Sequence, residues 1–271
     1  MTDWFETSLG KWLINQEKQF CQHLIPDGYY PTALQLGMGK EDYLSDIETG
    51  CGFVAVSSGD TDINDSPELK AKSEQSPLHK VKALPTALPF SDKTHSLIIM
   101  PHILDFCDDP HAVLREVNQI LIPEGCVVIT GFNQVSLWSA GRLGWSKYAN
   151  APWKGHYYRV KRVQDWLALL GFDIVGAKMF GYGPPLQNEK WRDKLNIAEK
   201  LGDRWWPGLG AAYMIVGKKR EIASSTSSMR LAWRRFIPAI ARPAVPATGS
   251  MSASGNDAGK ARLRLVVKNQ F

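Results

Sequence analysis

The stretch HSLIIMPHILDFCDDPHAVLREVNQILIPEGCVVITGFN, residues 95–133, decides the fold class of this chain. It opens with an apolar run that is typical of a strand buried on both faces of a sheet. The next segment has helical spacing, with Asp108 or Asp109 as its capping residue and Pro110 at its first position. One face of this helix is apolar and consists of Val113, Leu114, Val117, Ile120 and Leu121. Gly125 is expected to close the helix before a second apolar strand, so the stretch predicts a strand, a helix and a strand.

The same alternation of helical and strand patterns extends over residues 1–220. Helical spacing is present at residues 4–24 and at residues 160–172, where Gly171 closes the helix. Apolar runs typical of strands are residues 32–39, 52–58, 173–183 and 211–220. Alternation of this kind predicts an α/β fold with a mainly parallel sheet and helices on both faces. Ligands of such folds bind at the carboxyl ends of the strands.

Charge is distributed unevenly along the chain. The 271 residues carry a formal net charge of +5. Residues 221–271 supply +6, from eight Lys or Arg against two acidic residues, which leaves residues 1–220 at −1. A nearly neutral body gives no indication of nucleic-acid binding.

The last fifty residues differ in composition from the rest of the chain. Residues 221–271 are rich in Ser, Ala, Pro and Gly and poor in large apolar residues, so we expect a disordered tail. Within it, residues 229–240 form a short basic amphipathic stretch suited to an acidic partner or a lipid surface, although a plain solvated tail is the alternative. The expected organisation is a helical segment (1–30), an α/β domain (31–220) and this basic tail.

Cysteine usage and hydropathy indicate a cytoplasmic protein. The four cysteines lie far apart, with no Cys-x-x-Cys pair, which argues against a disulfide framework or a zinc site and favours a reducing compartment. No apolar run approaches the roughly 18 residues of a spanning helix, so we expect no membrane span. The first residues do not have the basic-then-apolar order of a signal peptide.

A glycine turn follows the first expected strand. In LQLGMGKED, residues 34–42, Gly37 and Gly39 lie where a backbone can approach a ligand closely. Gly-x-Gly alone is a weak signal, because an ordinary strand-ending turn looks the same. A nicotinamide cofactor would require a third glycine at the position of Asp42, so the pattern argues against a nicotinamide-dependent reductase.

Together with this turn, residues 88–133 resemble the central block of class I S-adenosylmethionine-dependent methyltransferases of the small-molecule type, those similar to methyltransferase type 11. The resemblance covers residues 32–218 and looks in particular like a little-characterised proteobacterial branch of that family. It is carried, in order and spacing, by Leu88–Phe90, Ser96–Met100, Asp109–Pro110, Leu114–Glu116, Ile120–Gly125 and Val127–Thr130.

The resemblance implies a Rossmann-like fold with a seven-stranded, mostly parallel sheet and S-adenosyl-L-methionine as cofactor. The backbone of Gly37, Met38 and Gly39 would approach the methionine part of the cofactor. The remaining positions implied for the cofactor are Ser57 near the ribose, Leu84 and Pro85 near the adenine, and Pro101 near the sulfonium.

The first motif of this chain is degenerate. Gln35 stands where the family usually has Asp, and Glu41 stands where it has a third glycine. Ser57 and Leu84 occupy positions at which acidic residues normally bind the ribose and the adenine. Losing the ribose carboxylate removes charge-assisted hydrogen bonds worth on the order of 1.5–3 kcal/mol each. A catalytically inactive binding or scaffolding protein of the same fold is therefore the alternative to methyl transfer.

His102 is the candidate catalytic residue. It lies in the loop after the third expected strand, which the resemblance places at the methyl end of the cofactor, and its ordinary pKa is close to neutrality. Packing against the cofactor or bonding to a backbone carbonyl is the structural alternative. Asp105 either orients His102 or ends the loop, and His111 is interpreted as a residue of the first helical turn. We expect no metal site from these three residues, because a loop and a helix would have to converge.

The substrate is expected to be a small molecule, and its binding residues come from two later segments. An aromatic, partly cationic group of side chains there would suit a planar or acidic compound. Its members are Asn133, Trp138, Arg142, His156 and Tyr157. A lid or core segment in which the aromatic residues only pack is the alternative.

Overall fold

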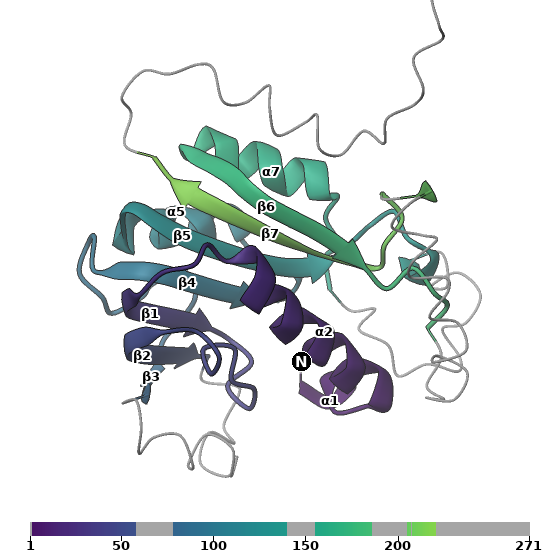
Figure 1. The fold of residues 1–271 in the computed structure, drawn as a ribbon, viewed down its shortest axis with the longest axis horizontal. Helices are drawn as coiled ribbons and strands as arrows, with labels where there is room; N and C mark the ends of the chain where they lie inside the picture. Colours follow the sequence, from purple (N-terminus) through teal and green to yellow (C-terminus); the bar gives the residue numbers. More distant parts are fainter. Residues whose placement is uncertain (1, 58–77, 140–154, 186–204, 207, 221–271) are drawn as a thin grey trace, which may run out of the picture. The chain divides into compact units, whose positions relative to one another are not determined.

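The computed structural model of the chain describes residues 2–57, 78–139, 155–185, 205–206 and 208–220. These residues form a seven-stranded sheet of order β3-β2-β1-β4-β5-β7-β6 (Figure 1). All pairs from β3 to β5 are parallel, and β7 runs antiparallel to both of its neighbours. The strands are Tyr30–Leu36 (β1), Thr49–Val56 (β2), Leu78–Lys82 (β3), His95–Pro101 (β4), Leu121–Phe132 (β5), Phe172–Phe180 (β6) and Ala212–Lys219 (β7).

Helices cover both faces of the sheet, as predicted. α2 lies on one face, in front of the sheet in Figure 1, and α5 and α7 pack on the other. Side chains alternate between the faces along each strand. In β4, Leu97 and Ile99 join the core under α2, whereas Ile98 and Met100 join the core under α5. The helix bounds are Thr2–Phe5 (α1), Ser8–Leu24 (α2), Ile103–Phe106 (α4), Pro110–Ile120 (α5) and Val160–Leu169 (α7).

α5 begins as its sequence predicts and ends differently. The carboxylate of Asp109 accepts a hydrogen bond from the backbone N–H of Ala112 at 2.9 Å, and Pro110 is the first helical residue. The predicted apolar face is buried throughout. The prediction that Gly125 closes the helix is wrong: the chain enters β5 at Leu121, and the residue with a positive φ in the turn is Glu124, at 62°. Gly171, in contrast, follows α7 with φ +83°, as expected for a closing glycine.

Two features of the first hundred residues were not predicted. The N-terminal helical pattern is divided into α1 and α2, because Thr7 caps α2 by accepting from the N–H of Gly10. β3, an edge strand with the sequence LHKVK, was missed because it has few apolar residues, three exposed residues and two that are partly buried.

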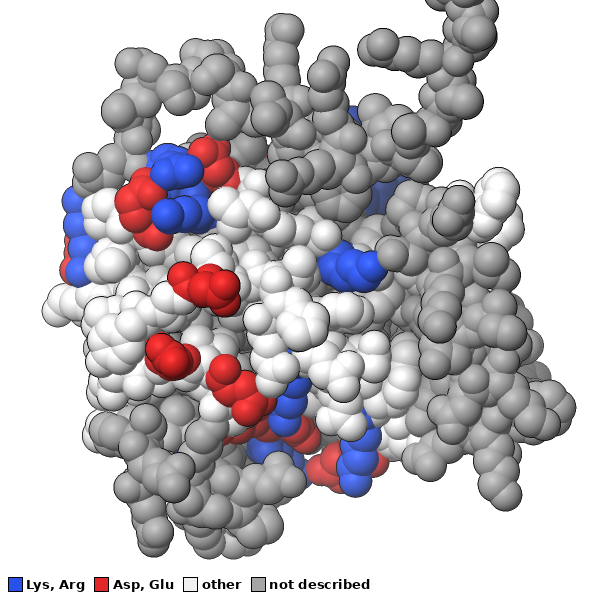
Figure 2. Space-filling view, in the orientation of Figure 1, with Lys and Arg blue, Asp and Glu red and all other residues white. Residues whose placement is uncertain are grey.

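The described surface mixes charges of both signs. On the face shown in Figure 2, acidic and basic side chains lie near each other. Ion pairs of the described chain include Lys40–Glu6 and Arg220–Glu124. Within the described residues, no helix is both long and apolar enough to span a membrane. The expected basic tail, residues 221–271, lies outside the described part of the chain.

Candidate active site at the carboxyl edge of the sheet

The order of the strands reverses between β1 and β4, and the loops that follow these two strands contain the predicted site. From β1 the chain first adds β2 and β3 on one side and then returns to add β4 and β5 on the other. Gly37 follows β1 directly, and His102 follows β4. In open parallel sheets, the crevice outside the carboxyl ends at such a reversal is where ligands bind.

The glycine turn has a backbone that requires its glycines. Gly37 has φ +79°, and Met38 after it also has a positive φ, 46°. A Cβ at Gly37 would overlap with the side chain of Ile103, and one at Gly39 would overlap with Val56. The turn is thus packed closely against the ends of β2 and β4, which favours glycine at both positions.

Gln35 forms side-chain hydrogen bonds with the backbone of this turn. Its side chain is fully buried, and its amide nitrogen donates to the carbonyl oxygens of Gly37, Met38 and Glu41 at 3.1, 3.2 and 2.8 Å. Its amide oxygen accepts from the N–H of Tyr43 at 3.0 Å. A carboxylate cannot donate to carbonyl oxygens, so Asp at this position would remove the side-chain donor from all three carbonyls. That of Met38 would keep the N–H of Glu41, at 2.9 Å, as a donor. The departure from the usual motif is therefore accommodated by a turn with inward-facing carbonyls.

His102 lies between two carboxylates from different parts of the chain. Its Nδ1 is 2.8 Å from Asp105 Oδ2, and its Nε2 is 2.8 Å from Glu17 Oε1 in α2. All three side chains have no exposed surface. His102 has φ 54°, an uncommon conformation for a residue other than glycine, and it precedes α4. The structure thus brings Asp105 to His102 and adds a partner, Glu17, that was not predicted.

The electrostatics of this triad favour a charged imidazole. Burial opposes protonation of His102, but the neighbouring Glu17 and Asp105 carboxylates outweigh it and raise the pKa of His102 to about 9. Burial raises the pKa of Asp105, against the hydrogen bonds from His102 and from the N–H of Phe132. The arrangement is a buried imidazolium held on both ring nitrogens by acceptors.

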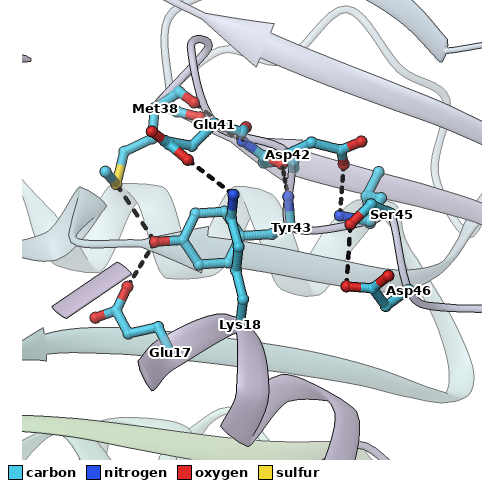
Figure 3. A network of polar contacts seen from close by, with 11 residues as sticks. Glu17, Lys18, Met38, Glu41, Asp42, Tyr43, Ser45 and Asp46 are labelled. Carbon is cyan, nitrogen blue, oxygen red and sulfur yellow. Dashed lines mark hydrogen bonds and ion pairs between the residues drawn. The ribbon is translucent and has the colours of Figure 1, made fainter. Parts of the chain in front are cut away.

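Tyr43 completes the contacts of Glu17 (Figure 3). Its hydroxyl donates to Glu17 Oε2 at 2.6 Å and lies 3.8 Å from the sulfur of Met38. Burial, with the adjacent Glu17 carboxylate, raises the pKa of Tyr43 well above its ordinary value, so the hydroxyl keeps its proton. Lys18, the next residue of α2, forms an ion pair with Glu41 at 2.8 Å. α2 is thus bound to the glycine turn by two neighbouring polar contacts.

Aromatic side chains from α1 and β5 pack near the His102 ring. The Phe5 ring lies 5.1 Å from the His102 ring, and Phe132, at the end of β5, lies 4.3 Å from it on another side. Trp4 packs edge-on against Phe132 at 5.6 Å. The N-terminal helices therefore lie over the ends of β4 and β5, directly above the predicted catalytic residue.

The other predicted cofactor residues all lie at the carboxyl edge. Ser57 follows β2 and is exposed, and Leu84, which follows β3, has 57% of its surface exposed. The N–H of Ala83 donates to the carbonyl of Val56 at 3.0 Å, so the ends of β2 and β3 are neighbours. Pro85 is half-buried beside Leu84, and Pro101 is buried at the end of β4.

The predicted substrate residues divide into different environments. Asn133 is buried and joins two loops, because its amide nitrogen donates to the carbonyls of Val135, Gly208 and Gly210 at 2.6, 3.0 and 3.0 Å. Trp138 is buried and donates to the carbonyl of Gly183 at 2.8 Å.

Of the rest of that set, Tyr157 belongs to the same buried apolar cluster as Trp138, whereas His156 does not. Tyr157 is buried with its ring 5.2 Å from Phe132, and His156 is exposed, with its backbone N–H donating to the carbonyl of Asp105. Arg142 lies outside the described residues. His111 is exposed in the first turn of α5, against Trp166, and no group of potential metal ligands is found within the described residues.

Glu17 is the main residue that sequence reasoning missed, although a signal for it exists. Leu9, Leu13, Glu17 and Cys21 follow one another at a spacing of four residues, and all are buried. Residues at this spacing share one helical face. A carboxylate in an apolar stripe is costly to bury alone, and its presence indicates a buried partner.

A parallel sheet of this order with an antiparallel β7 is the Rossmann-like fold of class I methyltransferases. Residues 34–129 match the family described as a methyltransferase domain. The match runs from the end of β1 through most of β5, and similar solved structures share the whole sheet.

The chain resembles known proteins both in sequence and in three-dimensional structure. The uncharacterized protein YafS of Escherichia coli (strain K12) is 33% identical over 151 residues, which are 56% of this chain and 59% of that protein. The match thus spans less than two thirds of its curated relative. A Thermotoga maritima structure, described as an S-adenosylmethionine-dependent methyltransferase and possible histamine N-methyltransferase, has a TM-score of 0.51 at 16% identity, covering 78% of this chain and 91% of its own.

A third similar structure was determined with a ligand. It is phosphoethanolamine N-methyltransferase 2 of Haemonchus contortus in complex with S-adenosyl-L-methionine. Its TM-score is 0.55 at 11% identity, covering 81% of this chain and 59% of its own. At these identities the two solved structures show the shared fold.

Proposed function

We propose that the chain binds S-adenosyl-L-methionine at the carboxyl edge of its sheet and transfers the methyl group to a small-molecule acceptor. The observation that carries this proposal is the pair of loops at the strand-order reversal, Gly37–Gly39 after β1 and Pro101–His102 after β4. The family match over residues 34–129 supports it. The similar structure with bound S-adenosyl-L-methionine supports the identity of the cofactor.

The residues present fit such a ligand in part. The glycine turn brings backbone rather than side chains to the edge, which suits a ligand that approaches closely. Exposed Leu84 and half-buried Pro85 offer an apolar surface for a planar ring. At the ribose position Ser57 offers a hydroxyl in place of a carboxylate, so we expect weaker binding than with an acidic residue.

The cofactor would supply the activated methyl group on its sulfonium, and the chain would orient the acceptor and manage its proton. His102 is the proposed acid–base residue. Because the folded chain holds His102 as an imidazolium between two carboxylates, it can accept a proton from a substrate only after one of these contacts opens and the ring has lost a proton.

Calorimetric titration with S-adenosyl-L-methionine and with S-adenosylhomocysteine tests the proposal. We expect binding of both ligands, and we expect Ser57→Asp to bind them about tenfold more tightly, because it restores a charge-assisted acceptor worth on the order of 1.5 kcal/mol. Ser91→Asp, at another exposed serine, is the matched control and should leave both affinities unchanged. Absence of binding at millimolar ligand, in the wild type and in Ser57→Asp, would contradict the proposal.

A binding or scaffolding protein without catalytic activity is the second candidate. It is favoured by Gln35, Ser57 and Leu84, which replace the usual acidic residues, and by the burial of His102 beneath α1 and α2. The titration separates the two candidates, because a chain that has lost its cofactor function should bind neither ligand.

A further inference from the structure

Glu17 is a buried charge that the fold alone does not require. It lies on α2, far in sequence from the loops of the candidate site, and its side chain has no exposed surface. A carboxylate buried in an apolar helix face costs several kcal/mol unless it is paired and hydrogen-bonded. Both of its oxygens are used: Oε1 contacts His102 and Oε2 accepts from Tyr43.

We propose that Glu17 is a positioning residue of the candidate active site: its contact with His102 holds α1 and α2 closed over the ends of β4 and β5, and the acceptor reaches His102 only when this contact opens. The proposal rests on the proposed function for the identity of the ligands. The contact itself is a property of the chain alone and can be tested without any ligand.

The closed arrangement leaves His102 no free ring nitrogen. Nδ1 faces Asp105 and Nε2 faces Glu17, each at 2.8 Å, and the ring of Phe5 covers it from α1. Of the two carboxylates, Asp105 is fixed locally, since it is three residues away and also accepts from the N–H of Phe132. Glu17 is the partner that can leave, because only it belongs to an element that covers the site from outside.

The remaining polar ties of α1 and α2 to the glycine turn are weak. Lys18–Glu41 and Lys40–Glu6 are partly exposed ion pairs, with side-chain exposures of 22% and 28% and of 38% and 57%. Pairs of this kind contribute little to stability. The Glu17 contact is fully buried, so it should affect closure more than either of these two pairs.

Protonation of His102 couples this contact to pH. The titratable groups that face the triad are Glu17 and Cys21 from α2, Asp105 from α4, Tyr43 and Glu41 from the segment after β1, and Tyr213 from β7. A neutral imidazole has a single N–H, so it can donate to one carboxylate only. Loss of the His102 proton should therefore weaken one of the two contacts and favour opening.

The rate of chemical labelling of Cys21 measures the opening of α2 directly. It is buried on α2, one turn after Glu17, whereas Cys126 is buried in the central strand β5. We would measure the rate at which a thiol reagent modifies each cysteine, identified by peptide mass spectrometry and normalised to the rate in unfolding concentrations of urea. Cys126 belongs to the same core under α2, but its backbone lies in the sheet and its thiol lies against Tyr30, so opening of α2 should expose Cys21 more than Cys126. Global unfolding exposes both residues equally.

Glu17→Gln should raise the normalised labelling rate of Cys21 about tenfold or more, corresponding to about 1.4 kcal/mol, and should raise that of Cys126 less. Glu6→Gln removes a carboxylate from the neighbouring segment and is the matched control, for which both rates should equal those of the wild type. An unchanged Cys21 rate in Glu17→Gln would overturn the proposal.

If Glu17→Gln raises both rates equally, Tyr43→Phe decides, because it removes one hydrogen bond to Glu17 and keeps every charge. A larger rise in the rate of Cys21 than of Cys126 in Tyr43→Phe supports the proposal, and an unchanged Cys21 rate overturns it.

Two further measurements distinguish a positioning role of Glu17 from a general contribution to the stability of the fold. The normalised Cys21 rate of the wild type should rise as pH passes through about 9, and that of Glu17→Gln should not show this step. Identical pH profiles would contradict the proposed coupling. S-adenosylhomocysteine should slow Cys21 labelling in the wild type. Binding by calorimetry without any slowing would show that α2 does not cover the ligand and would overturn the inference, whereas absence of binding would be a failure of the proposed function alone.

Discussion

At the scale of single residues, His102 should make the stability of the protein depend on pH. Its pKa is about 9 in the folded chain, against an ordinary value of 6.5. Because the folded-state pKa is raised, the stabilisation is fully present below pH 6.5 and is lost as pH rises through about 9, a difference on the order of 3 kcal/mol. Urea unfolding across this range should show the fall in the free energy of unfolding, and NMR titration of the His102 ring should show its midpoint.

A matched variant isolates this effect from other groups. Glu17→Gln removes one of the two carboxylates, so its stability should change less over the same pH range. The buried Tyr43 and Tyr213 hydroxyls, whose pKa values are also raised, act at higher pH, near the ordinary phenol value of 10. A flat profile for the wild type between pH 6.5 and 9 would show that His102 is neutral in the folded chain.

Gln35→Asp, which restores the usual residue of the motif, should destabilise this protein. The variant places a carboxylate at a fully buried position and removes the side-chain donor from three backbone carbonyls, of which that of Met38 also accepts from the N–H of Glu41. We expect a loss of about 3 kcal/mol or more in the free energy of unfolding, measured by urea denaturation. Gln19→Glu, at an exposed position of α2, is the control and should change stability little. A stable Gln35→Asp protein would mean that the turn can adopt another backbone conformation.

Local patterns predicted residues whose role depends on their immediate neighbours in sequence. Asp109 and Pro110 begin α5 because a cap and a fixed φ are properties of the first helical turn. Glu17 and Gln35 could not be assigned in this way. Their partners are set by the tertiary fold: His102 is 85 positions from Glu17, and the carbonyls around Gln35 face inward only in the folded turn.

At the scale of elements, the start of α2 should control how firmly the N-terminal helices cover the site. Thr7 accepts from the N–H of Gly10 at 3.1 Å and donates to the carbonyl of Trp4 at 2.7 Å, so one hydroxyl joins α1 to α2. Thr7→Ala should lower the free energy of unfolding by about 1 kcal/mol in thermal or urea denaturation. Thr7→Ser keeps the hydroxyl and should behave like the wild type. Equal losses in both variants would assign the effect to the methyl group instead of the cap.

The elements that the sequence predicted are those whose burial pattern is strong. β4 is buried along its whole length and α5 has a continuous apolar face, so both stand out from periodicity. β3 is an edge strand in which three of the five residues are exposed and the other two are partly buried. Such strands have little apolar pattern from which to predict them. The antiparallel direction of β7 was likewise not given by its apolar run, because strand direction is determined by the connection and not by composition.

At the scale of the whole molecule, the described fold ends with β7. This strand lies between β5 and β6 and is hydrogen-bonded to both. Arg220, directly after it, forms ion pairs with Glu124 and Asp173 that join the ends of β5, β6 and β7. Every described element thus precedes residue 221, and the composition of residues 221–271 indicates no core of their own.

A chain of residues 1–220 should therefore fold and bind ligand like the full chain. We expect the same urea midpoint and, where the full chain binds S-adenosylhomocysteine, the same affinity by calorimetry. Its net charge falls from +5 to −1, so any salt-sensitive binding of the full chain to anionic vesicles should be lost. A chain of residues 1–211 is the control: it lacks β7, so β5 keeps only β4 as a neighbour and β6 loses the strand with which it pairs, and this chain should not fold. A lower midpoint for residues 1–220 would show that the tail packs on the domain, and the expected boundary at residue 220 would then be wrong.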